Sequence, residues 1–167
     1  MSCSFTVAHG LGAHLKARGD SVAVAESSTA GLISASLLAV PGASAYFHGG
    51  AIIYTLQARR ELLGIDDATL RAQVPLSEPY VSLCAERIRT RLGATWGVAE
   101  LGATGPAPTP YGHAPGVCVL AVAGPVTLTE RVTTGSPDRA ANMQVFTQAA
   151  LALLEQALQL MDERARG

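Results

Sequence analysis

The stretch VAVAESSTAG at residues 22–31 decides the fold. Its first part, Val22–Ala25, is short, apolar and partly β-branched, which predicts a buried strand. Glu26–Thr29 then turns the chain, and Ala30–Val40 is expected to be helical until Pro41-Gly42 stops it. A buried strand that leads directly into a helix is the basic unit of an α/β protein.

The pattern on both sides of this unit predicts further helices and strands. Apolar residues along one face, including Phe5, predict a helix from Phe5 to Arg18. The other expected elements are an extended segment at Ala45–Tyr54 broken by Gly49-Gly50, helices at Gln57–Leu63 and Ser77–Leu92, a strand at Trp96–Leu101, a hairpin of Val117–Ala123 and Val126–Thr133, and a helix from Ser136-Pro137 to Glu163 followed by a frayed tail, Arg164–Gly167. Helices and strands alternate early and the hairpin comes late. We therefore expect one α/β domain over residues 1–167, a three-layer α/β/α sandwich around a mixed sheet.

Composition excludes several classes of protein. Of the 167 residues, 49% are hydrophobic and 15% are charged, which excludes a disordered chain. The net charge of -1 and the 5% aromatic content favour neither nucleic acid nor an anionic membrane as a partner. Apolar stretches such as Leu32–Val40 are far shorter than the roughly 18–20 residues of a membrane span, and no signal-peptide pattern opens the sequence. We expect a cytoplasmic protein.

Cysteine and histidine spacing gives no sign of a metal centre. Cys3, Cys84 and Cys118 are odd in number and lack a CxxC pair, which argues against a disulfide framework and a zinc site. His9, His14, His48 and His113 form no HxxxH pair, so surface or packing roles are expected for them. We predict no metal and no organic cofactor.

The turn after the first strand is the first candidate site. Ser27, Ser28 and Thr29 place hydroxyls at the start of a helix, where backbone N–H groups are unpaired and the helix dipole is positive. Such a turn binds anions or a developing oxyanion. The alternative is that one of these hydroxyls only caps the helix.

Two later stretches carry polar residues at strand ends. Tyr54 ends the second extended segment, and either binds a ligand or packs at a rim. Arg59 and Arg60 follow it, and either bind phosphate or carboxylate or form a solvated helix face. The stretch Gly102–Pro106 opens a loop rich in glycine and proline, which is either a ligand loop or a surface insertion.

Five motifs in a fixed order resemble the C-terminal domain of the CinA family. AESSTAG at residues 25–31 is similar to the family's AESCTGG, and residues 41–54 are similar to its PGSS..F..G...Y segment. LSEP at 76–79, GATGP at 102–106 and Asp138-Arg139 resemble VSEP, GIAGP and the GDR that opens the last helix. The family includes nicotinamide mononucleotide deamidases, so the resemblance implies hydrolysis of that nucleotide to nicotinic acid mononucleotide and ammonia.

The resemblance also implies a set of site residues. Ser27 matches the family's nucleophilic Ser, Tyr54 matches the Tyr that assists this nucleophile, and the family's catalytic Lys falls on Arg59. The expected substrate-binding residues are Ser28, Thr29, Ala30, Gly31, Gly102, Thr104, Gly105 and Arg139. The expected ligand is a small-molecule nucleotide, and the implied hydrolysis uses neither a metal nor an organic cofactor.

The residue at position 59 leaves two functions open. Arg stays protonated in proteins, so Arg59 can hold an anion but is a poor base for a serine nucleophile. The chain is therefore either an amidohydrolase, with low turnover or with His48 or His113 as its base, or a non-catalytic nucleotide- or partner-binding relative. A purely structural oligomer subunit is a third alternative.

Composition also predicts self-association. A chain of 17.2 kDa with so many apolar and so few charged residues is expected to bury apolar surface between subunits as a homodimer or higher homo-oligomer. Light scattering across a wide concentration range should give at least twice the chain mass. A constant mass near 17.2 kDa would contradict this prediction.

Overall fold

A five-stranded mixed sheet forms the centre of the molecule. The computed structural model describes residues 2–167, with side chains from residue 7 onward. The strands are β1 (Val22–Glu26), β2 (Phe47–Ile52), β3 (Trp96–Ala103), β4 (Val117–Ala123) and β5 (Leu128–Thr133). Their order is β2-β1-β3-β4-β5; β1 runs parallel to β2 and β3, and β4 is antiparallel to both of its neighbours.

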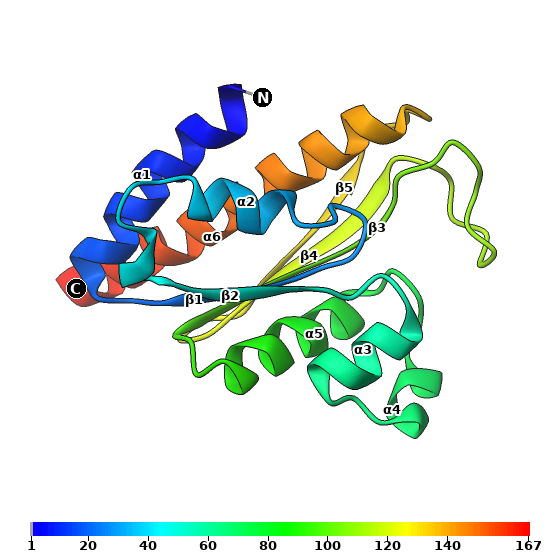
Figure 1. Cartoon of the computed structure of the whole chain (residues 1–167), viewed down its shortest axis with the longest axis horizontal. Coiled ribbons are helices and arrows are strands. Elements are labelled where there is room, and N and C mark those ends of the chain that lie inside the picture. Colours follow the sequence, from blue (N-terminus) through cyan, green and yellow to red (C-terminus); the bar gives the residue numbers. More distant parts are fainter. Residues whose placement is uncertain (1) are drawn as a thin grey trace.

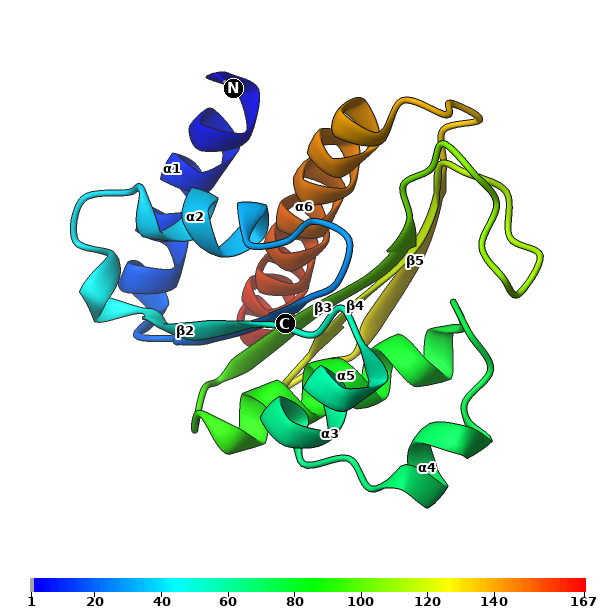
Figure 2. The ribbon, with the colours of Figure 1, turned by 45° about the vertical axis from the view of Figure 1, so that its right-hand side comes forward.

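Helices cover both faces of this sheet (Figures 1 and 2). On one face lie α1 (Ser2–Arg18), α2 (Leu32–Leu38) and α6 (Arg139–Arg166), and on the other lie α3 (Leu56–Leu63), α4 (Asp67–Ala72) and α5 (Glu78–Arg91). The predicted three-layer α/β/α sandwich with a mixed sheet is therefore confirmed. Among the described residues, no helix is long and apolar enough to cross a membrane.

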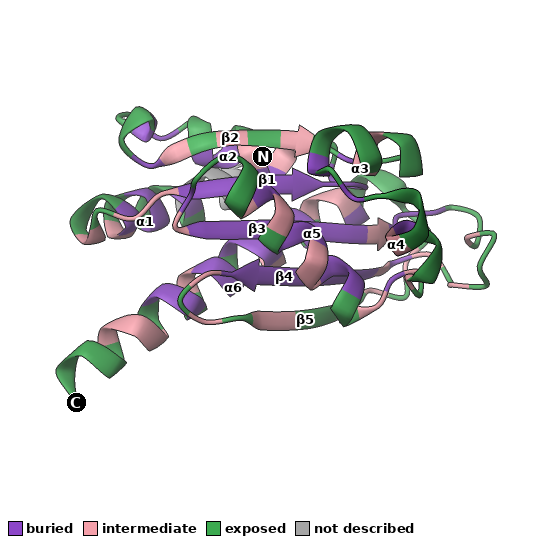
Figure 3. Ribbon diagram, turned by 90° about the horizontal axis from the view of Figure 1, so that it is seen from below, coloured by how far each residue is buried: buried purple, intermediate pink, exposed green. Residues whose placement is uncertain are grey.

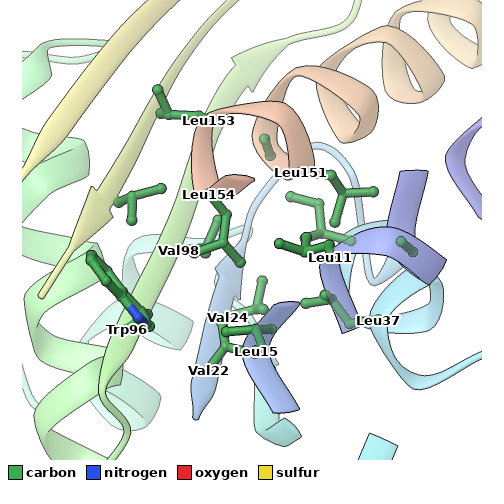
Figure 4. Packing of buried hydrophobic residues seen from close by; sticks show 14 of the residues in the cluster. Leu11, Leu15, Val22, Val24, Leu37, Trp96, Val98, Leu151, Leu153 and Leu154 are labelled. Carbon is green, nitrogen blue, oxygen red and sulfur yellow. The ribbon is translucent and has the colours of Figure 1, made fainter. Parts of the chain in front are cut away.

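The central strands are buried on both faces, as Figure 3 shows for β1, β3 and β4. Val22, Val24 and Val98 point to the α1–α6 side, where they pack with Leu11 and other apolar side chains (Figure 4). Alternate residues such as Ala23 contribute to a second cluster on the α5 side. Burial on both faces explains why the sequence of β1 is continuously apolar before Glu26.

Two expected elements near the first turn differ from the prediction. Helix α2 begins at Leu32 rather than Ala30, because Ala30 (φ 51°) and Gly31 (φ 100°) are left-handed. The break expected at Gly49-Gly50 is also wrong, since β2 continues through it with only a register irregularity at the start. Gly50 is required there because a Cβ would overlap the Ser34 hydroxyl.

The last helix and one short helix also differ from expectation. The N-cap of α6 is Asp138, which accepts a hydrogen bond from the Ala141 N–H, so the cap expected at Ser136 is two residues too early, whereas Asp138-Arg139 opens the helix as the resemblance implies. Residues 164–166 are helical rather than frayed. Helix α4 was not predicted, because its six residues are too few to show a periodicity. The inward face proposed for Phe5 lies outside the described side chains.

A charge cluster joins α1 to α6. The two ring nitrogens of His14 lie 2.8 Å from Glu155 Oε1 and 2.7 Å from Asp162 Oδ2, and Arg18 contacts Asp162 and Asp20. Both ring nitrogens face carboxylate oxygens, so both donate only when the ring is protonated. Burial lowers the pKa of His14, but its hydrogen bonds to Glu155 and Asp162 and their charges outweigh burial and raise that pKa above the ordinary value.

This cluster makes folding stability depend on pH. A raised folded-state pKa contributes stability that is complete below the unfolded pKa of about 6.5 and is lost as pH rises through the folded pKa. We expect His14→Gln to lower the melting temperature by a few degrees at about pH 6 and by much less at about pH 9. Thermal unfolding of both proteins at the two pH values checks this. An equal deficit at both values would exclude the imidazolium as its cause.

Candidate functional site

The carboxyl ends of β1 and β3 and the segment after β2 border a cavity of about 270 Å³. Its lining includes Ser27, Tyr54, Arg59, Tyr80 and Gly102. The carboxyl ends of neighbouring parallel strands meet at one edge of a sheet, which is where open α/β folds place their ligands. Three stretches that are far apart in the sequence therefore meet in one place.

Two further hollows adjoin this cavity and share Tyr54 with it. One, of about 260 Å³, is lined by Thr104, Gly105 and Arg139, and the other, of about 370 Å³, by Ser28, Ala30 and Arg139 among others. Tyr54 stands between them with 58% of its surface exposed. The fully buried Thr29 lines none of the three hollows.

Arg59 is fixed in place beside Ser27. Its Nε donates to the Ile53 carbonyl at 3.0 Å, its Nη1 donates to the Tyr80 hydroxyl at 2.8 Å, and its Nη2 lies 3.5 Å from Ser27 Oγ. The guanidinium also lies over the Tyr80 ring, 5.1 Å from its centroid. Within the described part of the chain, no carboxylate lies at ion-pair distance from Arg59. The positive charge of Arg59 therefore faces the cavity with no carboxylate to neutralise it in this part of the chain.

Arg60, the next residue, has the other role considered for these two arginines, which is to form a solvated helix face. Arg60 pairs with Glu61 and Asp67 on the exposed side of α3, so it belongs to a solvated face. Tyr80, which anchors Arg59, was missed by the sequence analysis. It lies on α5 directly after LSEP, and burial raises its pKa, which the hydrogen bond from Arg59 and the charge of Arg59 offset only in part.

Neither histidine considered as a base lines the three hollows. His48 is near the start of β2, at the opposite end of that strand from Tyr54, and contacts the Leu92 carbonyl. His113 lies in the long loop, where its N–H donates to the Thr109 hydroxyl. These positions argue against a direct proton transfer from Ser27 to either ring.

Two glutamates buried under the turn were also missed. Glu26 and Glu100 are fully buried and lie opposite each other in the β1–β3 pairing. Glu26 accepts hydrogen bonds from the backbone N–H groups of Gly31, Ile33 and Ser34 at 2.8–3.0 Å, and from the hydroxyls of Thr29 and Ser34. It therefore holds the N-terminus of α2, where the helix dipole favours negative charge.

Glu100 holds the other half of the turn. Its Oε2 accepts the N–H groups of Ser27 (3.1 Å) and Thr29 (3.0 Å), and its Oε1 accepts the Ser28 hydroxyl. The N–H groups of Thr29 and Gly31 are thus already used by carboxylates. Of the turn residues predicted to bind substrate, only Ser28 and Ala30 keep an N–H group without an acceptor in the described part of the chain.

Gly102 is needed for a different reason from the one the sequence suggested. A Cβ at this position would lie 2.6 Å from Glu100 Oε1 and would overlap Ser28 Oγ. The glycine therefore leaves room for the Ser28–Glu100 hydrogen bond, in addition to lining the cavity. In the neighbouring hollow, Arg139 Nη1 donates to the Gly105 carbonyl at 2.6 Å. This bond draws Arg139 to the loop after β3.

We expect Gly102→Ala to destabilise the protein by about 1–3 kcal/mol, because the added methyl group displaces the Ser28–Glu100 pair. Gly10→Ala is a matched control, since a Cβ at this exposed position in α1 meets no other atom. The control should be more stable by about 0.5–1 kcal/mol, because alanine favours a helix. Urea unfolding measures both changes. A Gly102→Ala protein as stable as the wild type would show that this space is not needed.

Sequence relatives carry the same name as the family inferred from the motifs. A CinA-like protein of Prochlorococcus marinus is 43% identical over 111 residues, which is 66% of this chain and 26% of the relative. A CinA-like protein of Gloeobacter violaceus is 35% identical over 155 residues, which is 92% of this chain and 36% of the relative. The chain thus spans about a quarter to a third of the length of these curated relatives.

Solved structures agree with this relation. A CinA superfamily protein from Klebsiella pneumoniae superposes with a TM-score of 0.87 at 26% identity, covering 93% of this chain and 98% of that one. The competence/damage inducible protein CihA from Agrobacterium tumefaciens gives 0.85 at 27% identity, covering 93% and 95%. The family model of the CinA C-terminal domain matches residues 4–158. From the motifs, the fold and these matches, the chain belongs to the CinA C-terminal domain family.

Proposed function

We propose that this chain is an amidohydrolase that uses Ser27 to hydrolyse a small anionic amide, with nicotinamide mononucleotide as the first candidate. One observation carries the proposal: Ser27 opens onto the cavity with the fixed, unpaired guanidinium of Arg59 3.5 Å from its hydroxyl oxygen. A serine at such a position can attack a carbonyl carbon. The nearby cation favours a substrate that carries negative charge.

The charges around the site support a nucleotide-like substrate. Arg59 faces the first cavity and Arg139 the two adjoining hollows. Guanidinium groups bind phosphate and carboxylate through paired N–H donors. Tyr54 lies between the two arginines, at the border of all three hollows, where its ring can contact a base or pyridine ring.

In the proposed reaction, Ser27 Oγ attacks the amide carbon and the carbonyl oxygen becomes negatively charged. The free N–H groups of Ser28 and Ala30 and the guanidinium of Arg59 are the donors that stabilise this oxyanion. Collapse of the intermediate releases ammonia, and water then hydrolyses the ester on Ser27. Arg59 stays charged throughout and holds the anion, because a guanidinium does not give up its proton.

A non-catalytic nucleotide-binding relative is the second candidate function. The observation that favours it is Arg59 itself, which stands where the resemblance places a catalytic Lys and is held by the Ile53 carbonyl and the Tyr80 hydroxyl. In this case the same cavity binds the nucleotide and releases it unchanged. Binding and turnover must therefore be measured separately.

We expect the purified protein to release ammonia from nicotinamide mononucleotide, and Ser27→Ala to lower this rate by about 10³-fold or more because the nucleophile is lost. Calorimetry should show that the variant still binds the nucleotide, since Arg59 and Arg139 remain. Ser44→Ala, at an exposed position in the short 3-10 helix Ala43–Ala45 that lines none of the three hollows, is the matched control and should leave the rate unchanged.

The results of these measurements distinguish the amidohydrolase from the non-catalytic relative. Turnover that survives in a folded Ser27→Ala protein excludes Ser27 as the nucleophile. Tight binding without ammonia in the wild type favours the non-catalytic relative. Neither binding nor turnover with this nucleotide, its nicotinic acid counterpart or other primary amides contradicts the proposed function.

A further inference from the structure

Ser27 must lose its proton as it attacks, and Arg59 cannot accept that proton. Arginine keeps its proton, and the two histidines of interest, His48 and His113, line none of the hollows. The two glutamates buried under the turn have no part in the mechanism so far. One of them, Glu100, accepts hydrogen bonds from Ser27, Ser28 and Thr29.

The Ser28 hydroxyl connects Glu100 to the site. Its single proton is directed to Glu100 Oε1, so its oxygen lone pairs are free to accept another proton. Ser27 and Ser28 are consecutive and line the same hollow. The buried carboxylate of Glu100 is therefore hydrogen-bonded to a hydroxyl that borders the same hollow as Ser27.

The two buried glutamates differ in the number of donors that hold them. Glu26 accepts five hydrogen bonds. The Thr29 hydroxyl lies 2.7 Å from Glu26 and 3.1 Å from Glu100, and its single proton can serve only one of them. Glu100 thus keeps fewer donors. Burial raises the pKa of Glu100, and the hydrogen bonds from Ser28, Thr29 and Ser27 only partly offset this.

We propose that Glu100 accepts the proton released by Ser27 and that the Ser28 hydroxyl carries it there. This inference rests on the proposed serine chemistry, and assigns the base that such chemistry lacks. Glu100 acts through Ser28 and does not touch the substrate, so it is a positioning and proton-holding residue. The other titratable groups around it are Glu26 on β1 and Cys118 on β4, whose thiol is buried and has a raised pKa.

The proton balance closes in both halves of the reaction. As the Ser27 Oγ–carbon bond forms, the Ser27 proton moves to Ser28 Oγ and the Ser28 proton moves to Glu100. When the carbon–nitrogen bond breaks, the proton returns through Ser28 to the leaving nitrogen, which departs as ammonia. Water then attacks the ester and gives its proton along the same path. That proton finally returns to Ser27 as its oxygen leaves the carbon.

A serine-reactive sulfonyl fluoride tests this path without knowledge of the substrate. Attack by Ser27 forms an oxygen–sulfur bond and expels fluoride, and it requires the same loss of a proton. We expect phenylmethanesulfonyl fluoride to label Ser27, as mapped by mass spectrometry of peptides. The labelling rate should rise with pH through a midpoint above the ordinary carboxyl range, because burial raises the pKa of Glu100.

Glu100→Gln removes the acceptor and preserves the turn. The amide oxygen can replace Oε2 for the N–H groups of Ser27 and Thr29, and the amide NH₂ can donate to Ser28 Oγ, which then accepts a hydrogen bond where it donated one before. We expect the labelling rate to fall by about 10²-fold or more and the pH midpoint to disappear. Unfolding curves of the variant establish that it is folded.

Two serine substitutions separate the proton path from a structural role. Ser28→Ala interrupts the path and should slow labelling of Ser27 to a similar extent as Glu100→Gln, whereas Ser28→Thr keeps a hydroxyl and should restore much of the rate. Ser34→Ala is the matched control, because it removes a serine hydroxyl from the other buried glutamate, Glu26. The control should keep the pH midpoint.

Three results would overturn the proposal. They are labelling of Ser27 with an unchanged rate and pH midpoint in a folded Glu100→Gln protein, labelling of Ser28 in place of Ser27, and no labelling at all. The failure of the proposed function gives a different result. In that case no amide is hydrolysed, although Ser27 labelling still depends on Glu100 and Ser28.

Discussion

Two carboxylates buried side by side under one turn are the constraint on which the rest of the site depends. Glu26 and Glu100 are register partners in adjacent parallel strands, and both are inaccessible to water. Buried carboxylates are costly unless hydrogen-bond donors surround them. The turn at 27–34 supplies these donors from its backbone and hydroxyl groups. The serines and threonine of this turn therefore stabilise the fold, apart from any part in the proposed chemistry.

This constraint also explains the unusual backbone of the turn. Ala30 and Gly31 are both left-handed, which delays the start of α2 and directs the N–H groups of Gly31, Ile33 and Ser34 at one carboxylate. A non-glycine residue in this conformation is uncommon and strained. The same arrangement leaves the N–H groups of Ser28 and Ala30 for a ligand. The N–H groups that hold the buried carboxylate and the N–H groups that stay available thus belong to different residues of the turn.

The sequence predicted the parts of this protein that depend on local patterns. Long apolar or periodic stretches gave β1, α5 and the mixed sheet, and motif order gave the family. Ser27, Tyr54, Arg59 and Gly102 meet at one cavity, as strand ends in this class of fold predict. Glu100 could not be assigned from the sequence, because its partner Ser28 is 72 residues away and a lone charge in an apolar strand does not identify its donors. The same holds for Tyr80, which anchors Arg59 across 21 residues.

The three hydrogen bonds of Arg59 have a consequence for the entropy of binding. Long side chains usually lose rotamer freedom when a ligand arrives, at about 0.5–1.5 kcal/mol for each one immobilised. Arg59 has lost this freedom on folding, because the Ile53 carbonyl and the Tyr80 hydroxyl hold its guanidinium in one orientation. An anion therefore meets a cation that is already ordered. This side chain cannot adjust to a poorly fitting anion without losing its hydrogen bonds to Ile53 and Tyr80.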